Sequence, residues 1–156
     1  MAISRIGTDG IEAGAVTQAD LASGVAGTGP AFRAYMANAQ TIPGVTFTKL
    51  NFNTEVFDTN SCYDTTTNRF TPNVAGYYQV SGSIYITATA QIYVYKNGAA
   101  DSTGPYANTT GFLTNSLVYL NGTTDYVELY IFSSAVTTNV TTAAQSQFSA
   151  SLVRAA

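Results

Sequence analysis

The sequence predicts an all-β sandwich of about eight to ten antiparallel strands. Three observations predict it. The chain combines neutral polar residues with 11 Tyr and 8 Phe in 156 positions, a mixture that favours pleated, half-buried strands over helices. Apolar and polar residues alternate with a period of two along several segments, whereas no long segment has the helical period. Turn signals separate these segments at short intervals, and the length suits a single domain.

Residues 1–30 differ in composition from the rest of the chain, because they are rich in Gly and Ala and contain no aromatic residue. Thr17 and Asp20 have the spacing of a capping box, and Gly24 could end a helix of about two turns. Two interpretations stay open. The segment is either a flexible leader or an attachment arm that orders on another protein through the apolar side chains of Ile3, Ile6, Ile11 and Val16. We therefore divide the chain into an N-terminal arm, 1–30, and a folded domain, 31–156.

The folded domain begins with clear strand signals. From Val45 to Phe52 the pattern places Phe47 and Lys49 on one face and Leu50 on the other. The next segment, YYQVSGSIYITA at 77–88, is the strongest strand signal in the chain. It predicts a core face made of Tyr78, Val80, Gly82, Ile84 and Ile86. The opposite face would carry Tyr77, Gln79, Ser81, Ser83 and Tyr85, and we expect it to be more exposed to solvent or to form part of an interface.

Two Asn-Gly dipeptides predict hairpins in the second half of the domain. Asn97-Gly98 ends the segment QIYVYK, and Asn121-Gly122 lies between SLVYL and DYVELYIF. In the last of these segments Val127, Leu129 and Ile131 alternate with Tyr126, Glu128, Tyr130 and Phe132. A final strand, QFSASLV, offers Phe148, Ala150 and Leu152 to the core.

Six residues in the middle of the chain stand at fixed intervals: Phe52, Asp58, Tyr63, Phe70, Gly76 and Tyr78. This pattern resembles the signature of the globular-head family of the first complement component (its q subunit), which shares the tumour-necrosis-factor jelly roll. The family pattern continues with a Phe and a second aromatic residue, where this chain has Val80 and Gly82. The resemblance implies a jelly-roll sandwich. Without the family, we expect Gly76 to provide a free backbone turn, Asp58 to cap a turn, and Phe52 and Phe70 to bury their rings.

The same resemblance implies a homotrimer, in which three jelly rolls pack around an axis. The surplus of tyrosines supports this independently, because they cannot all fit one small core and Tyr suits surfaces that are half buried and half wet. For any single Tyr, an edge or outer-sheet position explains it equally well. The candidate trimer residues are Tyr77, Tyr85, Tyr93, Tyr95, Tyr119, Tyr126 and Tyr130.

The opening ISRIGTDGIEAGAVT, residues 3–17, resembles the leader of many short head and tail proteins of bacteriophages. The N-terminus lacks the apolar core of a secretory signal peptide, and no apolar run approaches the length of a membrane span. We therefore expect a protein made in the host cytoplasm and carried on the virion surface. No membrane and no nucleic acid is an expected partner, since the net charge is −3 and no basic cluster exists.

Composition also argues against catalysis. The chain contains no His, which removes His-activated nucleophiles and imidazole metal sites. Asp58 and Asp64 are the closest candidates for a catalytic carboxylate pair, and Cys62 has no neighbouring base that would activate it. We expect no enzyme and no cofactor. Calcium is the one ion left open, because Asp58 and Asn60 have the spacing of the first ligands of a calcium loop.

Two functions fit these observations. The first is a trimeric capsid cement, or decoration, protein that reinforces the head surface and also aids host adhesion. Its arm would grip the major capsid protein, or a tail protein, and thirty extended residues span at most about 100 Å. The alternative is the receptor-binding tip of a tail fibre or tailspike, which would bind cell-surface glycan through the loops at 98–116 and 133–145.

Overall fold

The computed structural model describes residues 28–134, 137–138 and 145–156. These residues form twelve strands and no helix, so none of the described residues belongs to a helix that could cross a membrane. The strands are β1 Ala31–Tyr35, β2 Thr41–Ile42, β3 Thr46–Lys49, β4 Thr54–Asp58, β5 Tyr63–Asp64, β6 Arg69–Phe70, β7 Gly76–Lys96, β8 Ala99–Thr103, β9 Ala107–Leu120, β10 Val127–Ser133, β11 Thr137–Thr138 and β12 Gln147–Ala155.

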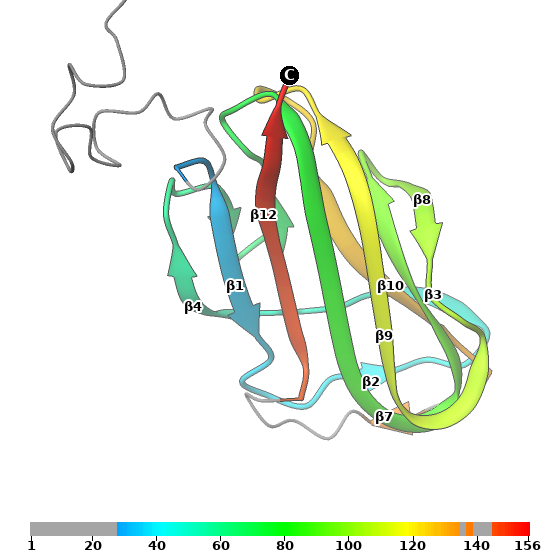
Figure 1. Ribbon diagram of the computed structural model, residues 1–156. Coiled ribbons are helices and arrows are strands. Elements are labelled where there is room, and N and C mark those ends of the chain that lie inside the picture. The colour runs from blue at the N-terminus through cyan, green and yellow to red at the C-terminus, as the bar shows by residue number, and fades with distance from the viewer. Residues whose placement is uncertain (1–27, 135–136, 139–144) are drawn as a thin grey trace, which may run out of the picture.

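Ten of these strands form one continuous antiparallel sheet, whose main path has the order β4-β1-β12-β7-β10-β6-β5. Strands β8 and β9 also pair with β7, and β3 pairs with β10. Strands β2 and β11 form a separate two-stranded sheet at one end of the molecule (Figure 1). The all-β sandwich expected from the sequence is therefore confirmed, with ten strands in the main sheet.

Strand β7 joins the two layers of the sandwich, because its 21 residues pair with different strands at its two ends. From Gly76 to Ile84 it lies between β9 and β12, and from Ala90 to Lys96 it pairs with β10. The register with β9 shifts between Ile84 and Thr87, a bulge that bends the strand. The side chains predicted to face the core from the first part of β7 are all buried.

Aromatic rings from distant segments fill the core between the layers. Phe32 stacks on Tyr63 and Phe70, with ring centres 4.3 and 4.7 Å apart, and meets Phe148 edge-on at 4.9 Å. Each fully buried ring stabilises the fold by roughly 2–3 kcal/mol. The four aromatic positions of the motif, Phe52, Tyr63, Phe70 and Tyr78, all belong to this core. Burial was predicted for Phe52, Phe70 and Tyr78, and it is confirmed for these three.

The motif glycine has a different role from the one expected. Gly76 does not adopt a left-handed conformation; it is the first residue of β7, paired with Ala155 of β12. A Cβ atom at this position would collide with the carbonyl oxygen of Arg154. Gly76 is therefore required for the close approach of two strands and not for a turn.

Of the two predicted hairpins, one forms. Asn97 and Gly98 have φ of 52° and 81°, the left-handed pair of a type I′ turn, and they join β7 to β8. The hairpin predicted at Asn121-Gly122 is wrong, because β9 pairs with β7 and not with β10. This segment crosses from one layer to the other. The Asn121 carboxamide oxygen accepts hydrogen bonds from the backbone N–H groups of Thr123, Thr124 and Asp125.

Candidate functional site

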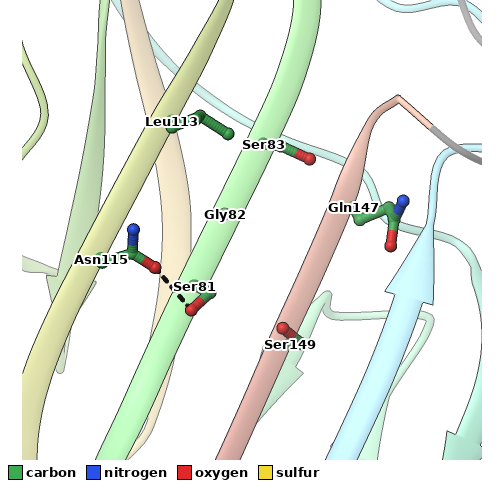
Figure 2. A pocket seen from close by; sticks show the side chains of 7 residues that line it. All are labelled: Ser81, Gly82, Ser83, Leu113, Asn115, Gln147 and Ser149. Carbon is green, nitrogen blue, oxygen red and sulfur yellow. Dashed lines mark hydrogen bonds between the residues drawn. The ribbon is translucent and has the colours of Figure 1, made fainter.

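The outer face of the layer β4-β1-β12-β7-β9 has a polar centre made of small side chains. Cross-strand pairing places Ser81 of β7 between Ser149 of β12 and Asn115 of β9. The Ser81 hydroxyl donates to the Asn115 carboxamide oxygen at 2.7 Å, and both side chains lie at a shallow hollow of about 240 Å³ (Figure 2). Because Ser side chains are short, another backbone could approach this centre closely. We call this surface the β12 face.

Large apolar side chains surround the polar centre. Leu113 and Leu117 of β9 are 65% and 58% exposed, and the rings of Tyr77 and Tyr119 lie 5.5 Å apart at the edge. Two further shallow hollows lie on this face. Phe57 of β4 lines one of them, and Tyr77, Leu117 and Val153 line the other. The exposed apolar residues of the β12 face are Phe57, Tyr77, Leu113, Leu117, Tyr119 and Val153. Six exposed apolar side chains on one face of a sheet make this surface a candidate for contact with another molecule.

The other layer carries an aromatic surface on its outer side. Tyr130 of β10 lies between Lys49 of β3 and Tyr93 of β7, and Phe132 pairs with Phe47 in the next row. The rings are in mutual contact, with Tyr95 stacked on Tyr130 at 4.0 Å between centres. This surface, which we call the aromatic face, consists of Phe47, Tyr93, Tyr95, Tyr126, Tyr130 and Phe132.

One end of the aromatic face holds a buried acid between two cations. Glu128 is only 1% exposed, and its Oε1 accepts hydrogen bonds from Lys49 Nζ at 2.9 Å and Arg69 Nε at 2.6 Å. The hydrogen bond to Glu128 raises the pKa of the Arg69 guanidinium. Desolvation raises the pKa of the neighbouring Tyr95 and Tyr130 hydroxyls, so these tyrosines stay neutral at physiological pH.

The seven candidate tyrosines thus do not gather on one surface. Tyr77 and Tyr119 lie on the β12 face, and Tyr85 lines a hollow beside Leu113 on the same side. The remaining four, Tyr93, Tyr95, Tyr126 and Tyr130, belong to the aromatic face. The sequence pattern did not single out Leu113 and Leu117 as surface residues, although the alternation in FLTNSLVYL places apolar residues on both faces of β9.

The two carboxylates considered above for catalysis and ion binding, Asp58 and Asp64, accept hydrogen bonds from backbone N–H groups in turns. The Asp58 carboxylate accepts from the N–H groups of Asn60 and Tyr63, and the Asp64 carboxylate accepts from Thr66 and Thr67. Bonding to Thr67 and Thr66 lowers the pKa of Asp64. The turn-capping role expected of Asp58 is confirmed. No group of three or more potential metal ligands occurs in the described part of the chain.

Cys62 is a buried free thiol, and burial raises its pKa. The thiol is therefore less ionised than an exposed cysteine at the same pH, which opposes nucleophilic reactivity. The segment 98–116, expected to be a loop that binds glycan, is mostly the strands β8 and β9, so the prediction of a loop there is wrong. Most of the second segment, 133–145, lies outside the described residues. The arm residues Ile3, Ile6, Ile11 and Val16 also lie outside them.

Comparison with solved structures identifies the fold. The globular domain of zebrafish complement 1qA aligns with a TM-score of 0.62 at 14% identity, covering 81% of this chain and 99% of that one. Murine APRIL aligns with a TM-score of 0.64 at 8% identity over 80% and 98%, and Eiger TNF from S. frugiperda with 0.60 at 9% over 81% and 92%. The chain is a jelly roll of the TNF and C1q type. No family model and no curated protein matches the sequence.

The jelly roll explains the departure from the family pattern at Val80 and Gly82. Val80 is fully buried in the core. Gly82 faces the opposite layer, where Leu129 of β10 occupies the space of a side chain at this position. A residue from the facing layer thus fills the space, and the jelly roll keeps a packed core without the second aromatic ring.

Proposed function

We propose that this protein is a non-enzymatic homotrimer that assembles through the β12 face. The observation that carries the proposal is the exposure of six large apolar side chains around a centre of short polar ones. Water contact at Leu113 and Leu117 costs free energy that a neighbouring copy would recover, at roughly 25 cal/mol per Å² of apolar surface buried. Jelly rolls of the TNF and C1q type are often trimeric and non-enzymatic, which supports the proposal.

Oligomeric mass tests it directly. We expect the full chain to have three times the protomer mass in sedimentation equilibrium at micromolar concentration. Leu117→Lys should give monomers, because a charge buried at an interface without a partner costs several kcal/mol. Leu117 is 58% exposed in the protomer, so the substitution should leave the fold intact. The matched control is Tyr106→Lys, at an aromatic residue that is 54% exposed and is not among the residues that define either face. A monomeric wild-type protein would overturn the proposal.

Within this class, we propose the role of a capsid cement protein displayed on a phage virion. This narrower role rests on the likeness of residues 3–17 to phage leaders, and a trimer suits the three-fold positions of a capsid. The arm would hold the major capsid protein while the jelly rolls reinforce the head surface, adding contact area across subunit boundaries. No cofactor is required for such a role.

The alternative is a tail-fibre or tailspike tip, and deletion of residues 1–27 separates the two. The deletion stops before Gly29 and Pro30, because Gly29 packs on Leu152 and the Pro30 carbonyl accepts from the Leu152 N–H. For cement, the full-length trimer binds isolated heads and the truncated trimer does not. For a tip, neither form binds heads and only the full-length form attaches to tails. Loss of the trimer on deletion would contradict both.

A further inference from the structure

The aromatic face lies on the opposite outer side of the sandwich from the β12 face, so a contact that covers the β12 face does not itself cover the aromatic face. Phe47 is the most exposed ring on it, 49% exposed, and lies 5.1 Å from Phe132 and 5.2 Å from Tyr93 between ring centres. Tyrosine hydroxyls and the Gln91 carboxamide lie among the rings, with the Tyr93 hydroxyl donating to Gln91 Oε1. The surface therefore offers apolar ring area and hydrogen-bonding groups side by side.

Arg69 is held at one end of this face in a fixed orientation. Its Nε donates to the buried Glu128, and its guanidinium carbon lies 4.1 Å from the centre of the Tyr126 ring. The terminal nitrogens have no hydrogen-bond acceptor among the described residues, and the side chain is 39% exposed. A guanidinium fixed through Nε and stacked on a ring keeps its outer fork of N–H groups ready for a planar anion.

The ion pairing near Arg69 favours an anion. Lys49 and Arg69 share a single carboxylate, that of Glu128, so the two cations have one ion-pair partner between them. Asp64 lies opposite Arg69 across β5 and β6 and keeps its negative charge, but its carboxylate hydrogen-bonds to Thr66 and Thr67 of its own turn and forms no ion pair with Arg69.

We propose that the aromatic face binds a carboxylate-bearing polysaccharide, a polymer of uronic acids, with pyranose rings on Phe47 and its neighbours and a carboxylate on Arg69 and Lys49. The apolar C–H surface of a sugar ring suits aromatic rings, and its hydroxyls suit the tyrosine and Gln91 groups. A carboxylate is the planar partner that an Arg fork binds with two parallel hydrogen bonds. This inference rests on the proposed function only in that the trimer leaves the face free.

The experiment is calorimetric titration of the full-length protein with short oligogalacturonate, which avoids avidity between the three subunits. The matched neutral probe is the same oligomer with its carboxylates fully methyl-esterified. We expect the acid form to bind at least tenfold more tightly than the ester. A sulfated dextran oligosaccharide of matched length, whose anions are tetrahedral and not planar, should bind more weakly than oligogalacturonate at equal charge.

Two variants separate the ring contacts from the fork. Phe47→Ala should weaken oligogalacturonate binding about tenfold or more, and Arg69→Lys should do the same, because Lys keeps the charge but loses the fork. The control Tyr106→Ala, at an exposed residue outside the set that defines this face, should keep wild-type affinity. Circular dichroism of each variant confirms that the fold is retained.

Four outcomes would overturn the inference: no binding by the wild-type protein, equal affinity for the acid and its ester, equal or tighter binding of the sulfated dextran oligosaccharide, or an altered oligomeric mass in Phe47→Ala. The last would make the aromatic face a contact between copies. Trimerisation is read from mass and sugar binding from titration, so failure of the proposed function and failure of this inference are distinguishable.

Discussion

Gly82 of β7 and Leu129 of β10 face each other across the core from opposite layers. The Leu129 side chain fills the space that a side chain at position 82 would occupy. Leu129 is 1% exposed, and the next atoms that a Cβ at Gly82 would meet belong to Thr114 at 3.3 Å and Ile92 at 3.4 Å. The two layers therefore meet closely at the Gly82–Leu129 pair. A well-packed core has little spare volume, so the pair limits how near the layers can approach.

Gly82→Ala should overpack this point. We expect the free energy of unfolding to fall by about 1–3 kcal/mol, because Leu129 must leave its rotamer to admit the added methyl group. Chemical denaturation with urea measures the loss. Leu129→Ala removes the atoms that the added methyl group would meet. As a single variant, with Gly82 unchanged, it should lower the free energy of unfolding by about 2–5 kcal/mol, because it leaves a cavity. The double variant should be more stable than the sum of the single effects predicts, and strict additivity would contradict the contact.

The sequence predicted those parts of the fold that depend on local chemistry. Alternation along β7 located its buried face, and the Asn97-Gly98 signal located a real turn, because both follow from pleating and backbone sterics within a few residues. Asn121-Gly122 has the same local signal but a different outcome. Its flanking strands lie in opposite layers, and strand pairing at long range is not encoded in a dipeptide. The close approach of Gly76 to the Arg154 carbonyl oxygen could not be predicted from the sequence either, because it also depends on strand pairing at long range.

Tyr63 predicts how stability depends on alkaline pH. Its hydroxyl donates to the Phe52 carbonyl at 2.8 Å, and desolvation raises its pKa above the ordinary value. Above about pH 10 the unfolded chain releases a tyrosyl proton that the folded chain keeps. Stability should therefore fall as the pH rises from about 10, by up to about 1.4 kcal/mol per pH unit for each such tyrosine. Denaturant midpoints measured from about pH 8 to about pH 11.5, on either side of the ordinary tyrosine pKa, test this.

Tyr78 behaves in the same way, since burial raises its pKa as well. Tyr63→Phe should therefore flatten the alkaline loss in part, and Tyr63→Phe combined with Tyr78→Phe should flatten it further. Cys62, whose pKa burial also raises, is present in all three proteins and does not affect the comparison. Parallel pH curves for the wild type and both variants would show that the hydroxyls ionise equally in the folded and unfolded chains.

Asn97 joins the β7–β8 turn to the start of β10. Its amide nitrogen donates to Asp125 Oδ1 at 2.8 Å, and its oxygen accepts from the Tyr126 N–H at 3.0 Å. Bonding to Asn97, and then to Lys96, lowers the pKa of Asp125. Asn97→Asp replaces the donor with a second carboxylate, so we expect a loss of about 1–2 kcal/mol near neutral pH.

The pH dependence identifies the cause of that loss. In the wild type, the lowered pKa of Asp125 gives stability that is present above about pH 4 and disappears as the pH falls through the folded value. The gap between wild type and Asn97→Asp should therefore narrow between about pH 7 and about pH 3. Asn97→Gly keeps the left-handed turn and adds no charge, so its deficit should change less over that range. A constant gap for Asn97→Asp would exclude repulsion between the carboxylates.

The sequence predicted tyrosine-rich surfaces but not their division into two. The alternation in β7 runs through the bulge between Ile84 and Thr87, where the strand leaves one layer for the other. Tyr77 and Tyr93 thus share a strand and lie on opposite outer sides of the sandwich. Glu128 shows a further limit. Its position in the alternation indicates an exposed acid, whereas packing by neighbouring rings and two cations buries it.

Glu128→Gln should destabilise the protein without changing its shape. Gln has nearly the same volume and keeps an oxygen acceptor, but it leaves Lys49 and Arg69 without a counter-charge. Since both cations are partly exposed, water offsets some of the penalty, and we expect a loss of about 2 kcal/mol, in the range for hydrogen bonds to charged groups. Guanidinium chloride would screen these charges, so urea unfolding at low salt is the appropriate measurement.

Lys49→Met separates charge from packing at the same carboxylate. Alone it should cost less than Glu128→Gln, because Arg69 continues to neutralise the acid. In the Glu128→Gln background it should be neutral or stabilising, because it removes a cation that has lost its partner. Equal unfolding midpoints for wild type and Glu128→Gln would contradict a stabilising role for the two ion pairs.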